Sequence, residues 1–196
     1  MINRFGLYDD TIQKSSCGVG FITRKDSKQT HELLKKSHEA LCAVPHRGGM
    51  SSQGTGDGAG ISIDLSGEFF SKITSKDLKS GDFCVGNFFL PNNPKFHNCA
   101  GKLIEKVMLK RKMSLLKSRI VPVNKKILSS TAKKEQLLIK QWIFKTPKNI
   151  NPFDLERETH EALLEIESKA FTSKNLYGLY PLSLSTKIQV LKGRLN

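Results

Sequence analysis

Four cysteines are the side chains in this sequence that could supply a nucleophile or bind a metal ion. They are Cys17, Cys42, Cys84 and Cys99. They lie far apart with no C-x-x-C pair, so their spacing fits neither a zinc site nor a disulfide scaffold, and we expect reduced thiols. Only Cys17 lies beside a glycine, Gly18, at the head of an apolar run. Taken alone, a cysteine in such a position is most often a small buried side chain.

A glycine-rich run, residues 46–60, is the second feature that could do chemistry. Its sequence is HRGGMSSQGTGDGAG, which requires a loop whose backbone adopts positive φ angles or approaches another group closely. The run does not match a phosphate-binding loop. It lacks the Gly-Lys-Ser/Thr ending of a P-loop, and Ala59 stands where a G-x-G-x-x-G motif needs its third glycine. Asp57 would also repel a phosphate. The histidines outside this run are His31, His38, His97 and His160, which we interpret as packing or surface residues.

The elements that must position these residues follow from hydrophobic periodicity. Residues 17–23 predict a short buried strand, and residues 61–65 and 83–90 predict two further strands. Residues 29–44 predict an amphipathic helix, because several residues share one face at helical spacing. These residues are Leu33, Leu34, Ser37, Leu41 and Val44.

The second half of the chain alternates helices and strands in the same way. We expect a helix from about 94 to 113, strands at 118–123 and 136–144, and a helix that begins at the N-cap Asn151 with Pro152 in its first turn. One face of that last helix is lined by Leu155, Thr159, Ala162, Leu163, Ile166 and Ala170. Residues 182–190 predict a single strand or a hairpin that turns near 185–187. On either reading one face carries Leu182, Leu184, Ile188 and Val190.

The mixed order of these elements, without an internal repeat, favours sheets packed against helices, an α+β fold in one domain that begins at Cys17. The composition is that of an ordinary globular protein. No run approaches the roughly 20 apolar residues of a membrane helix, and the first sixteen residues have no apolar stretch of the signal-peptide kind. We therefore expect a cytoplasmic protein that does not enter a membrane.

Several phrases of the sequence resemble a known family. CGVGF at 17–21, then a helix that leads to HRG at 46–48, resembles the class II glutamine amidotransferases, which have the N-terminal-nucleophile hydrolase fold. Three further phrases are similar, more narrowly, to the amidotransferase domain of the glutamate synthase large subunit: TGDGAG at 55–60, VGNFFLP at 85–91, and LSLST at 182–186 with the Lys192-Gly193 pair after it. The resemblance implies an αββα sandwich, of which residues 17–196 form a part.

The resemblance also implies a reaction. In this family the nucleophilic cysteine is the first residue of the mature chain, which here is Cys17 after removal of residues 1–16 as a propeptide; a disordered leader is the other reading of that segment. The free α-amino group, with a pKa of about 7.7–8, would act as the base for the thiol. The substrate would be L-glutamine, which the thiolate converts into ammonia and a γ-glutamyl thioester that water opens.

The other site residues come from the same resemblance. Arg47 corresponds to an arginine that packs near the nucleophile loop, so we expect a supporting role for it. Gly18, His46, Gly48 and Asp57 are expected to support the site as well, with Asp57 structural rather than catalytic.

Two pieces of the family's site have no counterpart in this sequence. They are the arginine that binds the glutamine carboxylate, in an Arg-Phe-Ser-Thr-like phrase, and the Asn-Gly oxyanion pair. An oxyanion donor is worth about 10²–10³ in rate, so we expect an incomplete domain that turns over glutamine poorly on its own and leaves a sheet edge for a second polypeptide or a further C-terminal segment. A split or frameshifted synthase, an expressed fragment and a shortened protein with a non-catalytic role all fit. We expect no cofactor in this chain; FMN and an iron–sulfur cluster would belong to a full-length synthase.

The charge distribution supports a second hypothesis. The net charge is +14, and the stretch from Lys102 to Lys148 holds fourteen basic residues against Glu105 and Glu135. Trp142 and Phe144 are its only aromatic residues, which argues against nucleic-acid binding. The alternative function is therefore a non-catalytic, amidotransferase-like interaction module that binds an acidic partner through this basic stretch.

Overall fold

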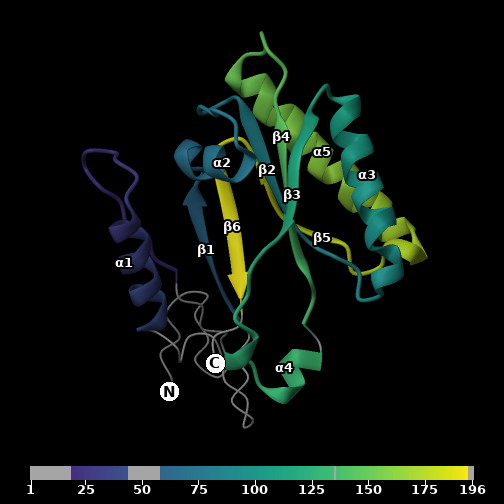
Figure 1. The fold of residues 1–196 in the computed structure, drawn as a ribbon, viewed down its shortest axis with the longest axis horizontal. Coiled ribbons are helices and arrows are strands. Elements are labelled where there is room, and N and C mark those ends of the chain that lie inside the picture. The colour runs from purple at the N-terminus through teal and green to yellow at the C-terminus, as the bar shows by residue number, and fades with distance from the viewer. Residues whose placement is uncertain (1–18, 44–57, 135, 194–196) are drawn as a thin grey trace, which may run out of the picture.

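The structure, a computed structural model, describes residues 19–43, 58–134 and 136–193. In this part of the chain, two antiparallel sheets pack with helices (Figure 1). The strands are β1 (Ala59–Asp64), β2 (Phe83–Phe89), β3 (Ser114–Ile120), β4 (Ile139–Lys145), β5 (Tyr180–Ser185) and β6 (Ile188–Gly193). The α-helices are α1 (His31–Cys42), α2 (Gly67–Thr74), α3 (His97–Lys110), α4 (Ser130–Lys134) and α5 (Pro152–Thr172). The α+β class predicted from the sequence is confirmed.

The larger sheet has the strand order β3-β4-β2-β5, with every neighbouring pair antiparallel. At one end of the sheet Phe83 pairs with Lys145, and at the other end Phe89 pairs with Ile139. Every residue of β2 except Phe89 is buried. The predicted run at 83–90 is thus a central strand covered on both faces, which explains why it reads as continuously apolar rather than alternating.

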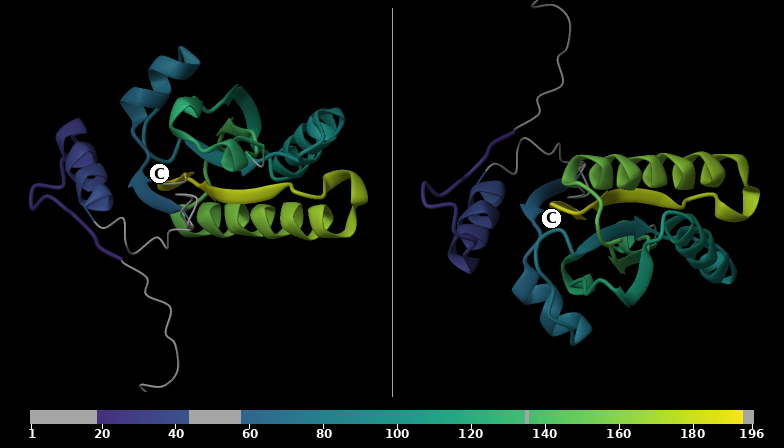
Figure 2. Two further views of the ribbon diagram at one scale, coloured as in Figure 1. Left: turned by 90° about the horizontal axis from the view of Figure 1, so that it is seen from below. Right: turned by 90° about the horizontal axis from the view of Figure 1, so that it is seen from above.

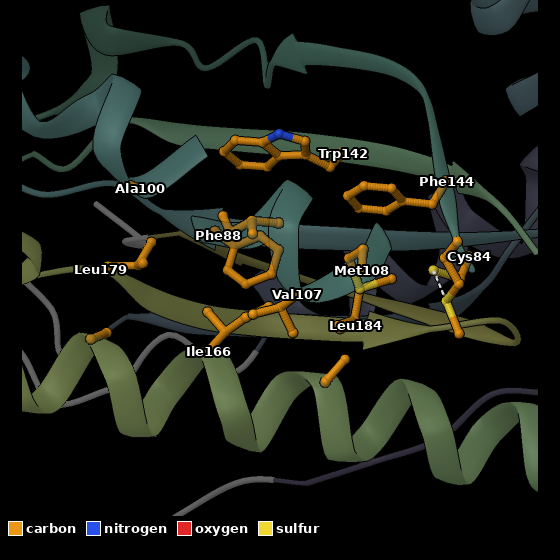
Figure 3. Close-up of a cluster of buried hydrophobic side chains, with 14 of the residues drawn as sticks. Cys84, Phe88, Ala100, Val107, Met108, Trp142, Phe144, Ile166, Leu179 and Leu184 are labelled. Carbon is orange, nitrogen blue, oxygen red and sulfur yellow. Dashed lines mark hydrogen bonds between the residues drawn. The ribbon is translucent and has the colours of Figure 1, made fainter. Parts of the chain in front are cut away.

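Helices α3 and α5 cover one face of this sheet and enclose the main hydrophobic core (Figures 1 and 3). Phe88 and Trp142 lie edge to face at its centre, with ring centroids 5.5 Å apart. Gly86 lies beside them, and a Cβ atom at this position would come within 2.6 Å of the Phe88 ring and 2.9 Å of Leu184 Cδ1. The core therefore packs directly against the backbone of β2.

Helix α5 forms as its sequence predicts. Asn151 has an extended backbone and its side chain accepts a hydrogen bond from the Asp154 backbone N–H, while Pro152 occupies the first helical position. The predicted apolar face is the buried one; its buried members are Leu155, Thr159, Ala162, Ile166 and Ala170. Figure 2 shows α5 running alongside β5.

The opposite face of the larger sheet meets α2 and the smaller sheet, which pairs β1 with β6. Phe70 of α2 is fully buried there, with its ring centroid 5.4 Å from that of Phe83. Val85 and Ile143 complete this second core from the larger sheet. The sheets thus lie face to face, with α3 and α5 as an outer layer.

The segment 182–190 is neither a single strand nor a hairpin. β5 pairs with β2 in the larger sheet, whereas β6 crosses over to pair with β1 in the smaller one. The predicted inward face is wrong in its second half, because Ile188 is 39% exposed while its neighbour Gln189 is buried. Gln189 is buried because it has hydrogen-bond partners in the larger sheet, as described below.

The predicted strand at 17–23 is also wrong over the part that is described. Residues 19–23 have no strand structure, and Val19 and Phe21 are more than nine-tenths exposed. A strand needs a neighbour for its backbone groups, and no described segment pairs with these residues. The helix after them is confirmed as α1, although its apolar residues Leu33, Leu34 and Leu41 are only half-buried. Val44 and Pro45 lie outside the described residues.

Candidate functional site

The residues predicted for the reaction centre lie outside the described residues. They are Cys17, Gly18, His46, Arg47, Gly48 and Asp57. The structure describes the framework that adjoins them, since Val19 directly follows Gly18 and Gly58 directly follows Asp57. The strands and hydrogen bonds of that framework therefore show where the glycine-rich run joins the fold.

The glycine-rich run enters the fold at one end of the two sheets. Gly58 has a positive φ of 99°, and β1 begins at the next residue, where Ala59 pairs with Gly193 of β6. Lys192 is the residue of β6 before Gly193, and its ammonium lies 5.9 Å from the centre of the Tyr180 ring at the start of β5. We call this end, defined by Ala59, Phe89, Tyr180 and Gly193, the loop end of the sandwich (Figure 1).

Strand β6 is fixed over the larger sheet by a row of buried polar side chains. The Gln141 side-chain amide donates two hydrogen bonds, to Asn87 Oδ1 at 2.8 Å and to Gln189 Oε1 at 3.1 Å. The Asn87 amide in turn donates to the Val190 carbonyl at 3.1 Å, and the Val190 N–H donates to Ser183 Oγ at 3.0 Å. Three strands of the larger sheet therefore bind β6 through its backbone and through one of its side chains.

Arg119 closes this polar row on the edge strand β3. Its Nε donates to Gln141 Oε1 at 2.8 Å, and its guanidinium lies 5.5 Å from the centre of the Phe69 ring. Partial burial lowers the pKa of Arg119 from its ordinary value, but an arginine remains charged at any physiological pH. The row consists of amides, the Ser183 hydroxyl and one permanent cation, so it positions strands and holds no group that titrates near neutral pH.

A carboxylate from α5 fixes the crossover between the two sheets. Glu156 accepts a hydrogen bond from Ser185 Oγ at 2.6 Å and further bonds from the backbone N–H and the hydroxyl of Thr186. Ser185 Oγ also accepts from the backbone N–H of Lys187 at 3.0 Å. The Ser-Thr pair that ends the LSLST phrase thus forms the turn that directs β6 toward β1.

Comparisons with known proteins identify the family. The family model described as class II glutamine amidotransferases matches residues 17–196. The chain belongs to this family. Helices packed on antiparallel sheets agree with its fold.

Relatives of this amidotransferase domain include glutamate synthases. The chain is 32% identical over 195 residues to ferredoxin-dependent glutamate synthase 1 of Arabidopsis thaliana, which covers 96% of this chain and 12% of the relative. It is 35% identical over 137 residues to the NADH glutamate synthase of Saccharomyces cerevisiae, covering 65% of this chain and 6% of the relative. The large chain of the NADPH glutamate synthase of Azospirillum brasilense is 30% identical over 95% of this chain and 12% of the relative. The domain therefore matches a small part of much longer proteins.

The described thiols of this amidotransferase domain differ sharply in access. Cys84 is fully buried in the main core, 3.9 Å from the Met113 sulfur, and burial raises the pKa of its thiol well above the ordinary value (Figure 3). Cys42 and Cys99 are exposed, and the Cys42 sulfur lies 3.8 Å from a ring nitrogen of His38 on the same helix face. Cys84 thus cannot act as a nucleophile, whereas Cys42 and Cys99 can react with small reagents.

The described part of the domain has no ligand set for an iron–sulfur cluster. Across residues 19–43, 58–134 and 136–193, no group of three or more His, Cys, Asp or Glu side chains could hold a metal ion. None of the helices in these ranges is long and apolar enough to cross a membrane.

The sequence analysis missed the polar row and the Glu156 contact. Asn87 was available as a signal, because it is the single amide within an otherwise apolar strand, and Gln141 was a weaker one, because its strand also carries Lys140 and Lys145. A buried amide needs a partner, so two such residues in separate strands suggest neighbouring positions in one sheet. Nothing in the local sequence indicates that Gln189 is the third member.

Proposed function

We propose that this chain carries the glutamine-hydrolysing site of a glutamate synthase-like protein, with Cys17 as the nucleophile. The observation that carries the proposal is the family match, which begins at Cys17 and extends to residue 196. The names of the relatives add the expectation that the ammonia released is used to make glutamate.

The proposed reaction needs a free α-amino group on Cys17, and hence removal of residues 1–16. The amino group takes the thiol proton, and the sulfur attacks the side-chain amide carbon of L-glutamine. The same proton then goes to the leaving nitrogen as the C–N bond breaks, which releases ammonia and leaves a γ-glutamyl thioester. Water adds to the thioester carbon, the C–S bond breaks, and glutamate leaves while the thiol is regenerated.

The supporting residues are proposed around this nucleophile. Arg47 would pack against the nucleophile loop, with Gly18, His46 and Gly48 near it, and Asp57 would hold the glycine-rich run. The described framework favours such a role for Asp57, because that residue immediately precedes the left-handed Gly58 and the paired strand β1. β1 is in turn fixed to β6, which the polar row attaches to the larger sheet.

The remaining chemistry of glutamate formation is proposed to lie outside this chain. A flavin, an iron–sulfur cluster and the site that consumes ammonia would belong to a second polypeptide or to a further segment of the same one. We place the glutaminase reaction in the cytoplasm as part of the same proposal, and fluorescence localisation of the tagged protein tests that assignment.

Labelling with a glutamine-analogue electrophile tests the proposed nucleophile. We expect the chloroketone analogue of glutamine to modify Cys17 and excess L-glutamine, but not D-glutamine, to prevent it. The exposed thiols of Cys42 and Cys99 are internal controls, since iodoacetamide should label both with or without L-glutamine. Equal modification of all three thiols, without protection by L-glutamine, would contradict the proposal.

A further inference from the structure

The basic stretch from Lys102 to Lys148 is divided by the fold rather than gathered on one surface. It runs through α3, β3, α4 and β4. Strand β4 alone carries Lys140 near one end and Lys145 at the other, and a strand of seven residues is about 20 Å long. The lysines of the stretch are therefore spread over several elements, and each group has to be considered where it lies.

The densest group lies on the connection between β3 and β4, residues 121–138. Its lysines are Lys125, Lys126, Lys133 and Lys134, all exposed. Glu135 is the only acidic residue between Glu105 and Asp154 in the sequence. Clustered like charges repel one another, and a single acidic residue offsets only part of the cost of gathering four lysines. We call this segment the lysine connection.

Hydrogen bonds hold the described residues of the lysine connection, 121–134 and 136–138, against the sheet and within local turns. Its first residue is joined to the sheet by a 2.9 Å bond from the Val121 N–H to the Ile139 carbonyl. Asn124 caps a 3-10 turn by accepting from the Lys126 N–H, and Ser129 Oγ accepts from the N–H of Ala132, which is 2% exposed. The four lysines are therefore presented on a base that is fixed before any partner binds, which lowers the entropic cost of binding.

The lysine connection extends from the loop end of the sandwich. It leaves β3 after Ile120 and rejoins at Ile139, the residue paired with Phe89. Lys192 and Tyr180, which mark the entry of the glycine-rich run, lie at the same end (Figure 1). A partner bound to the lysines would thus lie beside the region where β1 begins.

The side chains around the lysines favour a protein over a nucleic acid. Two aliphatic residues are exposed beside them, Ile120 at 59% and Val123 at 43%. Residues 121–138 contain no arginine and no aromatic residue, although stacking aromatics and bidentate arginines are what nucleic-acid surfaces use. Lysines around an exposed aliphatic patch match a protein surface in which carboxylates surround an apolar centre.

We propose that the lysine connection is a docking surface for an acidic protein face, contacted by Lys125, Lys126, Lys133 and Lys134 with Ile120 and Val123. This role is independent of glutamine hydrolysis.

Binding of two probes with equal charge tests the proposal. One is a helical peptide with glutamates on both sides of a leucine stripe, and the other is a single-stranded oligonucleotide of the same net charge. The main variant is K125E/K126E/K133E/K134E. The matched control, K76E/K79E/K145E/K148E, changes the net charge equally at the opposite end of the sheet, where Phe83 pairs with Lys145. A third variant, I120S/V123S, removes the aliphatic contacts, and circular dichroism checks the folding of all three.

We expect the main variant to bind the peptide about tenfold or more weakly, since four surface ion pairs are each worth a few tenths of a kcal/mol, while the control changes binding less than about twofold. The I120S/V123S variant should weaken binding of the peptide and leave that of the oligonucleotide unchanged. Equal losses in the two charge-reversed variants would overturn the proposal in favour of a long-range charge effect. Tighter binding of the oligonucleotide through the same lysines would overturn it in favour of a nucleic-acid surface.

Discussion

Replacing Gln141, the central amide of the polar row, should destabilise the domain far more than the small change in side-chain volume suggests. Gln141→Met keeps the approximate volume of the side chain but removes three hydrogen bonds, two donated to Asn87 and Gln189 and one accepted from Arg119. Asn87 and Gln189 are buried, so their oxygens lose a partner that water cannot replace, whereas half-buried Arg119 can turn to solvent. At about 1–3 kcal/mol for each of the two unsatisfied buried groups, we expect a loss of about 2–6 kcal/mol in the free energy of unfolding.

Urea unfolding followed by tryptophan fluorescence measures this loss directly. Trp142 is the single tryptophan of the chain, follows Gln141 in β4 and is fully buried, so its emission reports unfolding of the larger sheet. Gln136→Met, at a half-buried position outside the row, is the control and should change stability by less than about 0.5 kcal/mol.

A second variant separates lost hydrogen bonds from altered packing. In Gln141→Met/Gln189→Met the acceptor on Gln189 is removed together with its donor, so the double variant should lose less stability than the sum of the two single variants, by at least about 0.5 kcal/mol. A cost for Gln141→Met near that of the control, or additive costs in the double variant, would refute the account of the polar row.

Three further variants test other parts of the structure. Glu165 accepts hydrogen bonds from Lys169 and Arg111, which lower the pKa of its carboxyl from about 4.5 to about 2; the resulting stabilisation is complete above pH 4.5 and lost as the pH falls through 2. Glu165→Gln should therefore be less stable than the parent at pH 7 and equally stable below pH 2. The free energy of unfolding of both proteins, measured over this pH range, tests the prediction. A difference between them that does not change with pH would contradict it. Asn151→Ala removes the cap of α5 and should cost about 1 kcal/mol in urea unfolding, with Asn175→Ala, at an exposed position outside that cap, as its comparison. Gly86→Ala places a Cβ against Phe88 and Leu184 and should cost about 1–3 kcal/mol, while Gly20→Ala, with open space around it, should be neutral; equal midpoints for both would show that the core is not packed against β2.

Local signals were sufficient for some elements of the fold. The Asn151-Pro152 start of α5 and its buried face were predictable because cap, proline and periodicity agree within one segment. The strand at 83–90 was predictable because a central strand covered on both faces is apolar throughout. In both cases the evidence lies within a short stretch of sequence.

Other elements depend on partners that are distant in the sequence. Residues 19–23 are as apolar as a strand requires, yet no described segment supplies a neighbour for them. Hydrophobicity placed Ile188 inside β6, but hydrogen bonding from Gln141, 48 residues away, buries Gln189 instead. The crossover of β6 to a second sheet depends on Glu156, which precedes it by 30 residues.

The candidate site illustrates the same limit. Cys17, Arg47 and Asp57 were assigned by resemblance to a family, which the match over residues 17–196 now establishes for the chain. Their individual roles remain predictions, because the structure describes the strands that adjoin them and not the residues themselves.

The most direct test of the central claim is the intact mass of the purified protein, taken before and after brief exposure to the glutamine-analogue electrophile. Our account predicts a chain that begins at Cys17 and gains a single adduct, which Cys17→Ala abolishes and Cys99→Ala preserves. A chain that still begins at Met1 and remains unmodified would contradict the account of Cys17 as an N-terminal nucleophile.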